Sequence, residues 1–129
     1  ATILSHAQGS GHPDGITDMP GFTALKALKK ANMTIDQIDL IEINEAFAVM
    51  PLVSTLVMAN GDKAKAEELR AKTNVNGGAI AIGHPTGASA ARLVMTACME
   101  MRRRGGGYAL VTICGGIGEA ECMVLKVEA

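Results

Sequence analysis

Apolar and polar residues change their spacing along the chain, and each change predicts an element. Residues 2–8, "TILSHAQ", are predicted to form a strand that ends at a turn-rich loop. In residues 21–33 the apolar side chains return at helical spacing, and Pro20 suits the first position of that helix. A second strand is predicted at the beginning of "IDLIEINEAFA", residues 38–48. The chain therefore begins with a predicted strand, helix and strand.

The middle of the chain continues this alternation of helices and strands. Residues 48–59 are apolar on nearly every side, so we expect a buried helix with Pro51 in its first turn. The charged residues 61–72 predict a helix or an excursion at the surface. A third strand is expected at residues 74–82, "NVNGGAIAI", and a third helix at residues 85–104, where glycines stop it.

Two more apolar runs, residues 108–114 and 121–127, close the chain with a glycine-rich turn between them. That turn is too short for a crossover, so the fifth strand should run antiparallel to the fourth. The predicted order is β-α-β-α-β-α-β-β, and such alternation favours an α/β fold. We therefore expect one domain over residues 1–129, with a five-stranded mixed sheet and helices on both faces.

The composition of the chain makes two classes of function unexpected, nucleic-acid binding and a role in the membrane. The chain has 129 residues with 12 basic and 13 acidic side chains, and aromatic residues make up only 2 %. Because it offers neither a large basic patch nor stacking platforms, nucleic-acid binding is not expected. The longest apolar stretch, residues 46–59, is too short and too interrupted to span a bilayer, so no membrane role is expected either.

The three cysteines, Cys98, Cys114 and Cys122, are an odd number without a CxxC spacing. That usage is typical of reduced thiols in a cytoplasmic protein rather than of a disulfide framework or a metal site. No charged and apolar leader precedes the first predicted strand. Because the first residue is Ala1 rather than Met, either an initiator methionine was removed or the sequence belongs to a longer chain.

Polar and reactive side chains follow three of the predicted strands. Asn44 comes after "LIEI", His84 after "AIAI" and Gly83, and Cys114 after "ALVTI". The carboxyl ends of parallel strands meet at one edge of a sheet, where open α/β folds bind ligands. The sequence therefore predicts that an amide, an imidazole and a thiol come together in one site.

Each of these side chains has a chemical and a purely structural interpretation. His84 precedes a predicted helix N-terminus, where it could move a proton or donate to an oxyanion, or simply occupy a turn. Cys114 could donate a proton if its pKa falls toward the working pH, or it could pack as a buried thiol. The backbone N–H of Gly116 could donate to an oxyanion. Asn44 could cap a helix, and Glu45 could be catalytic or only suit a helix dipole.

Three sequence motifs together resemble the C-terminal half of thiolases, the acyl-CoA acyltransferases such as acetyl-CoA acetyltransferase. They are "INEAFA" at residues 43–48, "NVNGGAIAIGHPTGASAARL" at residues 74–93 and "CGGIGEA" at residues 114–120. Their order and spacing match as well, so the resemblance covers essentially the whole chain. It implies a thiolase-like fold, coenzyme A thioesters as substrates and no separate cofactor.

In thiolases a nucleophilic cysteine takes the acyl group of an acyl-CoA and passes it on in Claisen condensation or thiolysis. The resemblance implies that His84 activates this cysteine and forms an oxyanion hole with a water held by Asn44. Cys114 would be the acid/base that moves protons to and from the substrate α-carbon or the departing CoA. The N–H of Gly116 would complete the oxyanion hole of the acyl-enzyme, and Phe47 would contact the CoA substrate.

The resemblance also leaves one large gap. The nucleophilic cysteine of thiolases lies in their N-terminal half, and none of the three cysteines here matches its context. We therefore expect the chain to be inactive alone and to work in a hetero-oligomer, as the small subunit of a split thiolase, or to be a fragment of a longer thiolase chain. A larger partner would supply the nucleophile. The alternatives are a non-catalytic scaffold or regulatory subunit and, on weaker grounds, a cysteine hydrolase that uses Cys114 and His84.

Overall fold

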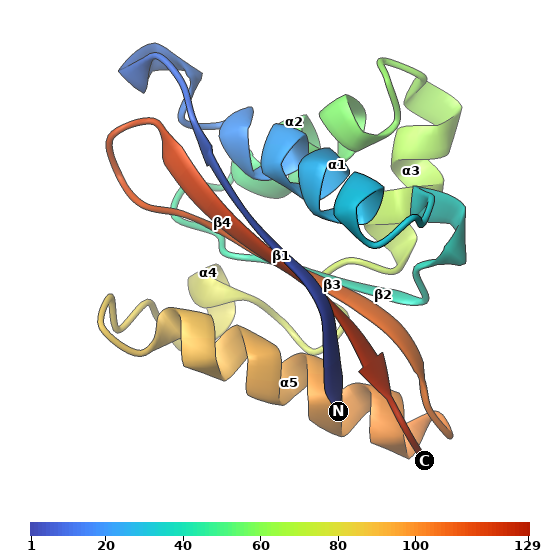
Figure 1. The fold of residues 1–129 in the computed structure, drawn as a ribbon. Coiled ribbons are helices and arrows are strands. Elements are labelled where there is room, and N and C mark those ends of the chain that lie inside the picture. The colour runs from blue at the N-terminus through green and yellow to red at the C-terminus, as the bar shows by residue number, and fades with distance from the viewer.

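The strands of the chain form one mixed sheet in a computed structural model that describes residues 1–129 (Figure 1). Its 4 strands lie in the order β1-β4-β3-β2, with bounds Thr2–Ser10 for β1, Leu40–Ile43 for β2, Gly107–Cys114 for β3 and Glu119–Val127 for β4. β2 is parallel to β3, whereas β4 is antiparallel to both of its neighbours, β1 and β3. The predicted antiparallel arrangement of the last two strands is confirmed.

Helices cover both faces of the sheet, as the sequence predicts (Figure 1). α1, α2 and α3 lie on one face, and α4 and α5 lie on the other. Their bounds are Met19–Lys30 for α1, Met50–Met58 for α2, Lys63–Ala71 for α3, Ala79–Ile82 for α4 and Ser89–Arg103 for α5, with 3₁₀ turns at Pro13–Gly15 and Ile35–Gln37. None of these helices is long and apolar enough to cross a membrane.

The core has one apolar cluster on each face of the sheet. The cluster on the side of α1 to α3 contains 15 buried residues, and the cluster beneath α5 contains 8. Ala7, Ala24 and Ala27 are fully buried, and such small side chains let α1 lie close to β1 and β4. Aliphatic, alanine and methionine side chains thus fill a core that has almost no aromatic residues available.

The third predicted strand is wrong, and the sheet has 4 strands rather than five. Only one parallel bridge, between Ile41 and Thr73, extends the sheet beyond β2. The apolar residues 79–82 form the single-turn helix α4 instead. Such a short apolar run is compatible with either element. Gly77 and Gly83, with φ of 85° and 92°, turn the chain on both sides of the run, so an extended strand cannot continue there.

Asn74 takes the place of a third strand beside β2. Its Oδ1 accepts the N–H of Ile43 at 2.8 Å, and its Nδ2 donates to the carbonyl of the same residue at 2.9 Å. With φ of 50°, Asn74 adopts the left-handed conformation that asparagine tolerates better than most residues. One side-chain amide therefore satisfies both backbone groups at the end of β2.

The remaining helices lie close to their predicted positions. The charged segment forms the helix α3, whose N-cap Asp62 accepts the N–H of Lys65 at 3.1 Å. α2 and α5 begin later than expected, and Pro51 lies in the first turn of α2 as predicted. Residues 84–88 therefore form a loop between α4 and α5 rather than the start of a long helix.

Glu42 is a buried carboxyl group on the face of β2 that packs against α5. Its side chain is 1 % exposed, and its Oε1 has no hydrogen-bond partner. Burial raises the pKa of Glu42 from 4.5 to about 7, against the opposing influence of the positive charge on Arg92. Between these two pH values the folded chain keeps a proton that the unfolded chain releases. The free energy of unfolding therefore falls as the pH rises through this window.

Glu42→Gln is expected to stabilise the chain near pH 8 by up to about 3 kcal/mol and to change little near pH 4. The amide cannot ionise, so the cost of charging a buried carboxyl group disappears. Urea unfolding at the two pH values measures the effect, with Glu128→Gln as a control at an exposed position. Equal stability of Glu42→Gln and the unaltered chain near pH 8 would contradict the prediction.

Candidate active site

The carboxyl ends of β2 and β3 lie side by side because these strands are parallel neighbours. Asn44 follows β2 and is 1 % exposed, and its N–H donates to the carbonyl of Thr112 in β3 at 3.0 Å. Cys114 is the last residue of β3 and is half-buried. The structure therefore brings the candidate amide and thiol to the same edge of the sheet.

His84 reaches this edge by a different route from the predicted one. It follows the helix α4 rather than a strand, so only two of the three candidate loops continue from strands. Gly83 ends α4 with a φ of 92°, a conformation that favours glycine, and His84 then comes into contact with Asn44. The imidazole is exposed in this chain, but both of its nitrogens have protein partners.

Asn44 and Ser89 hold the imidazole of His84 through its two nitrogens. Asn44 Nδ2 lies 3.3 Å from His84 Nε2, and Ser89 Oγ lies 2.6 Å from His84 Nδ1. The hydroxyl proton of Ser89 is used in donating to the carbonyl of Pro85 at 3.1 Å, so Oγ accepts the proton of Nδ1. Nε2 is then the unprotonated nitrogen; it accepts from Asn44 Nδ2 in this structure, and its lone pair is the one on the ring that can take a proton.

Ser89 is a contact that the sequence analysis does not anticipate. It is fully buried at the start of α5 and lies 5 residues after His84. A serine at the start of a helix is ordinarily explained as a cap, so its spacing from a histidine gives no signal. Only the folded loop between α4 and α5 brings its hydroxyl to the ring.

One pocket of about 310 Å³ gathers most of the candidate residues. His84, Cys114, Gly116 and Phe47 line it, and the other lining residues are Ile16, Ala46, Thr86, Ile113 and Gly115. Asn44 is not on the pocket wall, and its Nδ2 contacts Nε2 of His84. Phe47 is 54 % exposed, so its ring is open to a ligand. An imidazole, a thiol and a glycine backbone thus border one accessible space.

Burial raises the pKa of the Cys114 thiol above its ordinary value, and the negative charge of Glu119 acts in the same direction. Backbone hydrogen bonds at Cys114 and Gly116 act in the opposite direction. The structure thus shifts this pKa away from neutrality, whereas the sequence argument required a fall toward the working pH. The thiol is therefore protonated at neutral pH, a state that suits a group donating a proton.

The turn after Cys114 depends on glycine. Gly116 and Gly118 have φ of 112° and 91°, in the region that side chains with a Cβ rarely adopt. A Cβ at Gly118 would also lie 2.9 Å from the carbonyl oxygens of Gly11 and His12. The close approach of these two loops holds the backbone of the turn beside the pocket.

The remaining histidines and cysteines lie outside this pocket. His6 pairs with Glu121 on the sheet surface, and His12 caps the first 3₁₀ turn. Cys98 lies on α5 and packs against the cluster beneath that helix, and Cys122 is buried in β4. No three histidine, cysteine or acidic side chains gather closely enough to bind a metal ion.

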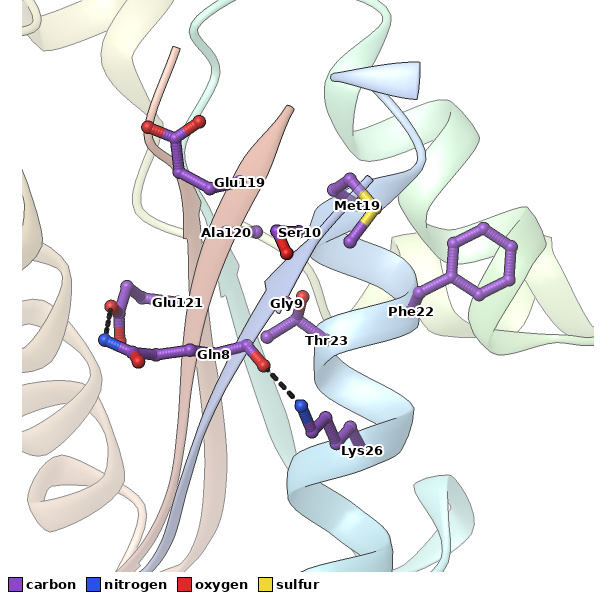
Figure 2. Close-up of a pocket in the computed structure, with 10 residues that line it drawn as sticks. All are labelled: Gln8, Gly9, Ser10, Met19, Phe22, Thr23, Lys26, Glu119, Ala120 and Glu121. Atoms are coloured by element: carbon purple, nitrogen blue, oxygen red, sulfur yellow. Dashed lines mark hydrogen bonds between the residues drawn. The ribbon is translucent and has the colours of Figure 1, made fainter. Parts of the chain in front are cut away.

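A larger pocket of about 680 Å³ lies between α1 and the ends of β1 and β4 (Figure 2). Lys26 reaches across from α1 to donate to the carbonyl of Gln8 at 2.7 Å, and the side chain of Gln8 donates to Glu121 (Figure 2). This pocket contains neither a histidine nor a cysteine, and it shares no lining residue with the pocket of His84 and Cys114. The candidate chemistry therefore lies in the smaller pocket.

Comparison with known proteins agrees with the resemblance of the motifs. The family model described as the thiolase C-terminal domain matches residues 1–127. The chain is 45 % identical to an acetyl-CoA acetyltransferase of Syntrophomonas wolfei, over 100 % of this chain and 31 % of the relative. It is 42 % identical to a probable acetyl-CoA acetyltransferase of Mycolicibacterium smegmatis, over 98 % of this chain and 30 % of the relative. It is also 48 % identical to a beta-ketoadipyl-CoA thiolase of Acinetobacter baylyi, over 78 % of this chain and 24 % of the relative.

The chain spans less than a third of the length of each of these relatives. Within that span the family model covers nearly every residue, including the three motifs around Asn44, His84 and Cys114. The chain therefore belongs to the thiolase family and corresponds to its C-terminal domain.

Proposed function

We propose that the chain is the acid/base and oxyanion-binding half of an acyl-CoA C-acyltransferase. The observation that carries the proposal is the contact between Asn44 and the imidazole of His84, beside a pocket that His84 shares with Cys114 and Gly116. These are the groups that a reaction at a thioester or ketone carbonyl needs apart from its nucleophile. The names of the relatives, acetyl-CoA acetyltransferase and beta-ketoadipyl-CoA thiolase, support coenzyme A thioesters as the substrate class.

In the first half of thiolysis, two proton transfers fall to these side chains. His84 Nε2 takes the proton of a nucleophilic cysteine that lies outside this chain, and the thiolate attacks the 3-keto carbonyl of the substrate. The bond between C2 and C3 then breaks, and the Cys114 thiol gives its proton to the released α-carbon. Protonated His84, held by Asn44, and the N–H of Gly116 would stabilise the oxygens that become negative.

The second half returns both protons. An incoming coenzyme A gives its thiol proton to the Cys114 thiolate and takes the acyl group from the nucleophilic cysteine. The cysteine leaves as a thiolate and recovers its proton from His84. Every group of this chain is thereby restored, and the same steps in reverse perform the Claisen condensation of two acetyl-CoA molecules.

Part of the chain surface is apolar and fits a role in a larger assembly. Met95 and Met99, four positions apart on α5, are 60 % and 73 % exposed, and Ile80 and Ile82 on α4 are 67 % and 57 % exposed. Exposed large apolar side chains that gather on one side of a protein mark interaction surfaces. Because the chain spans less than a third of its relatives, we assign this surface to the contact with the N-terminal part of a thiolase, as a partner chain or as the preceding part of the same chain.

A reconstitution experiment tests the proposal. The chain is assayed for cleavage of acetoacetyl-CoA by coenzyme A, first alone and then fused behind the part of the Syntrophomonas wolfei relative that precedes the matched region. We expect no activity from the chain alone, because it lacks the nucleophile, and thiolysis by the fused enzyme. Activity of the chain alone would overturn the need for a second part. Fused activity that is insensitive to Cys114→Ala would favour a non-catalytic scaffold instead.

A further inference from the structure

Glu45 comes directly after Asn44 and reaches the segment that carries His84. We propose that Glu45 is a positioning residue whose carboxylate fixes the start of α4 and thereby places His84 against Asn44. This role rests on the proposed function of His84 and Asn44, but separate contacts carry it. The sequence by itself is equally compatible with a catalytic Glu45 and with one that only suits a helix dipole.

One carboxylate oxygen of Glu45 caps α4 from outside the helix. Glu45 Oε2 accepts the N–H of Ile80 at 2.9 Å. Ile80 lies in the first turn of α4, where backbone N–H groups have no partner within the helix. The N-cap residue Gly78 has no side chain to supply one, so the acceptor comes from the loop after β2.

The other carboxylate oxygen ties Glu45 to Asn74. Asn74 Nδ2 lies 3.3 Å from Glu45 Oε1, and the same amide group is already paired with the backbone of Ile43. Asn74 and Ile80 lie on opposite sides of the glycine turn at residues 77–78. The two oxygens of Glu45 therefore hold both sides of that turn against the end of β2.

The carboxylate of Glu45 packs directly against the backbone of Gly78, which has no side chain. A Cβ at Gly78 would collide with this carboxylate, and Gly77 turns the chain just before it with a φ of 85°. Glu45 is absent from the lining of the pocket that His84 and Cys114 share. Because both of its oxygens accept hydrogen bonds and neither borders the pocket, Glu45 is placed to hold the backbone rather than to exchange a proton with a substrate.

Glu45 and Asn44 together close a ring of contacts around α4. Glu45 holds the first turn through Ile80, and Asn44 holds His84 just beyond the last residue of the helix. A helix of 4 residues is about 6 Å long, so a shift of its start moves its end as well. Loss of the Glu45 contact should therefore displace the imidazole from Asn44 without removing any group from the pocket.

Glu45→Ala and Glu45→Gln in the fused enzyme separate positioning from proton transfer. We expect Glu45→Ala to lower kcat about 10- to 100-fold, with little change in KM and the same shape of pH profile, because misplacement of a reacting group by about 1 Å has effects of this size. Glu45→Gln keeps a carbonyl oxygen that can accept the N–H of Ile80, so it should recover most of the loss. A proton-transferring Glu45 would instead leave both variants equally impaired and remove one limb of the pH profile.

Hydrogen–deuterium exchange in the fused protein tests the same contact without any measurement of activity. Peptides that cover residues 78–84 should exchange faster in Glu45→Ala than in the unaltered protein, and Glu45→Gln should lie between them. Glu68→Ala, which removes an exposed carboxylate from α3, is the matched control and should leave these peptides unchanged. If Glu45→Ala does not fold, the hydrogen–deuterium exchange of Glu45→Gln tests the contact instead. Glutamine has nearly the size of glutamate and keeps one acceptor oxygen.

The results distinguish this inference from the proposed function. An inactive unaltered fusion whose exchange still responds to Glu45→Ala would count against the function and support the contact. An active fusion in which Glu45→Ala changes neither kcat nor exchange would overturn the positioning role. Loss of kcat in Glu45→Ala with unchanged exchange would overturn it as well, since the effect would then not pass through α4.

Discussion

His84→Ala is expected to lower the kcat of the fused enzyme for acetoacetyl-CoA cleavage by about 10²- to 10⁴-fold. In the proposed mechanism, the substitution removes the base that deprotonates the nucleophile and, once that base is protonated, a donor to the oxyanion. Because Ser89 accepts the proton of Nδ1 at 2.6 Å, Nε2 is the ring nitrogen left for this chemistry. Steady-state kinetics at saturating coenzyme A should show the loss mainly in kcat, since the imidazole acts on the reacting atoms.

Two companion variants make the His84 result specific. His6→Ala removes a histidine that pairs with Glu121 outside the pocket, and it should keep the activity of the unaltered fusion. Ser89→Ala keeps the imidazole but frees its Nδ1, so we expect a smaller loss than for His84→Ala. A kcat for His84→Ala within about tenfold of the unaltered value would contradict the acid/base assignment.

Cys114→Ala is expected to lower kcat by about 10²- to 10⁴-fold as well, because it removes the proposed proton donor for the released α-carbon. Burial and Glu119 raise the pKa of the thiol, so the donor form persists from neutral into alkaline pH. The rate of the cleavage step should fall only as the pH rises past this raised pKa. Single-turnover release of acetyl-CoA, followed as the pH rises from neutral into the alkaline range, should show that descending limb, and Cys114→Ala should lack it.

The controls for Cys114 separate acidity from packing. Cys98→Ala removes a thiol of α5 that lies outside the pocket, and it should leave the rate unchanged. Cys114→Ser keeps a small polar side chain but replaces the thiol with a much weaker acid, so it should stay impaired. Full activity of Cys114→Ser would show that the position needs only a small side chain, and it would contradict the proton-donor role.

The sequence by itself determined most of the elements and named most residues of the candidate site. The strand-like runs at both ends, the helical spacing after Pro20 and the glycine turn between β3 and β4 are local patterns, so their physical causes are visible in neighbouring residues. The antiparallel pairing of β3 and β4 follows from a turn too short for a crossover. The motifs around Asn44, His84 and Cys114 indicated the family that the comparison then matched over residues 1–127.

Only the tertiary structure decided how His84 reaches the site. The run "AIAI" is compatible with a strand or a helix, and distant contacts resolve the choice. The amide of Asn74 occupies the edge of β2, and the carboxylate of Glu45 caps the first turn of α4. The first contact joins residues 31 positions apart and the second joins residues 35 positions apart, so the spacing of neighbouring residues cannot predict them.

The protonation of the site was also decided by the fold. Ser89 determines which nitrogen of His84 stays unprotonated, and burial beside Glu119 keeps Cys114 protonated. The type of a residue sets which group can titrate, whereas burial and neighbouring charges set where the proton stays. The sequence therefore named the candidate side chains, and the packing of the chain determined their state.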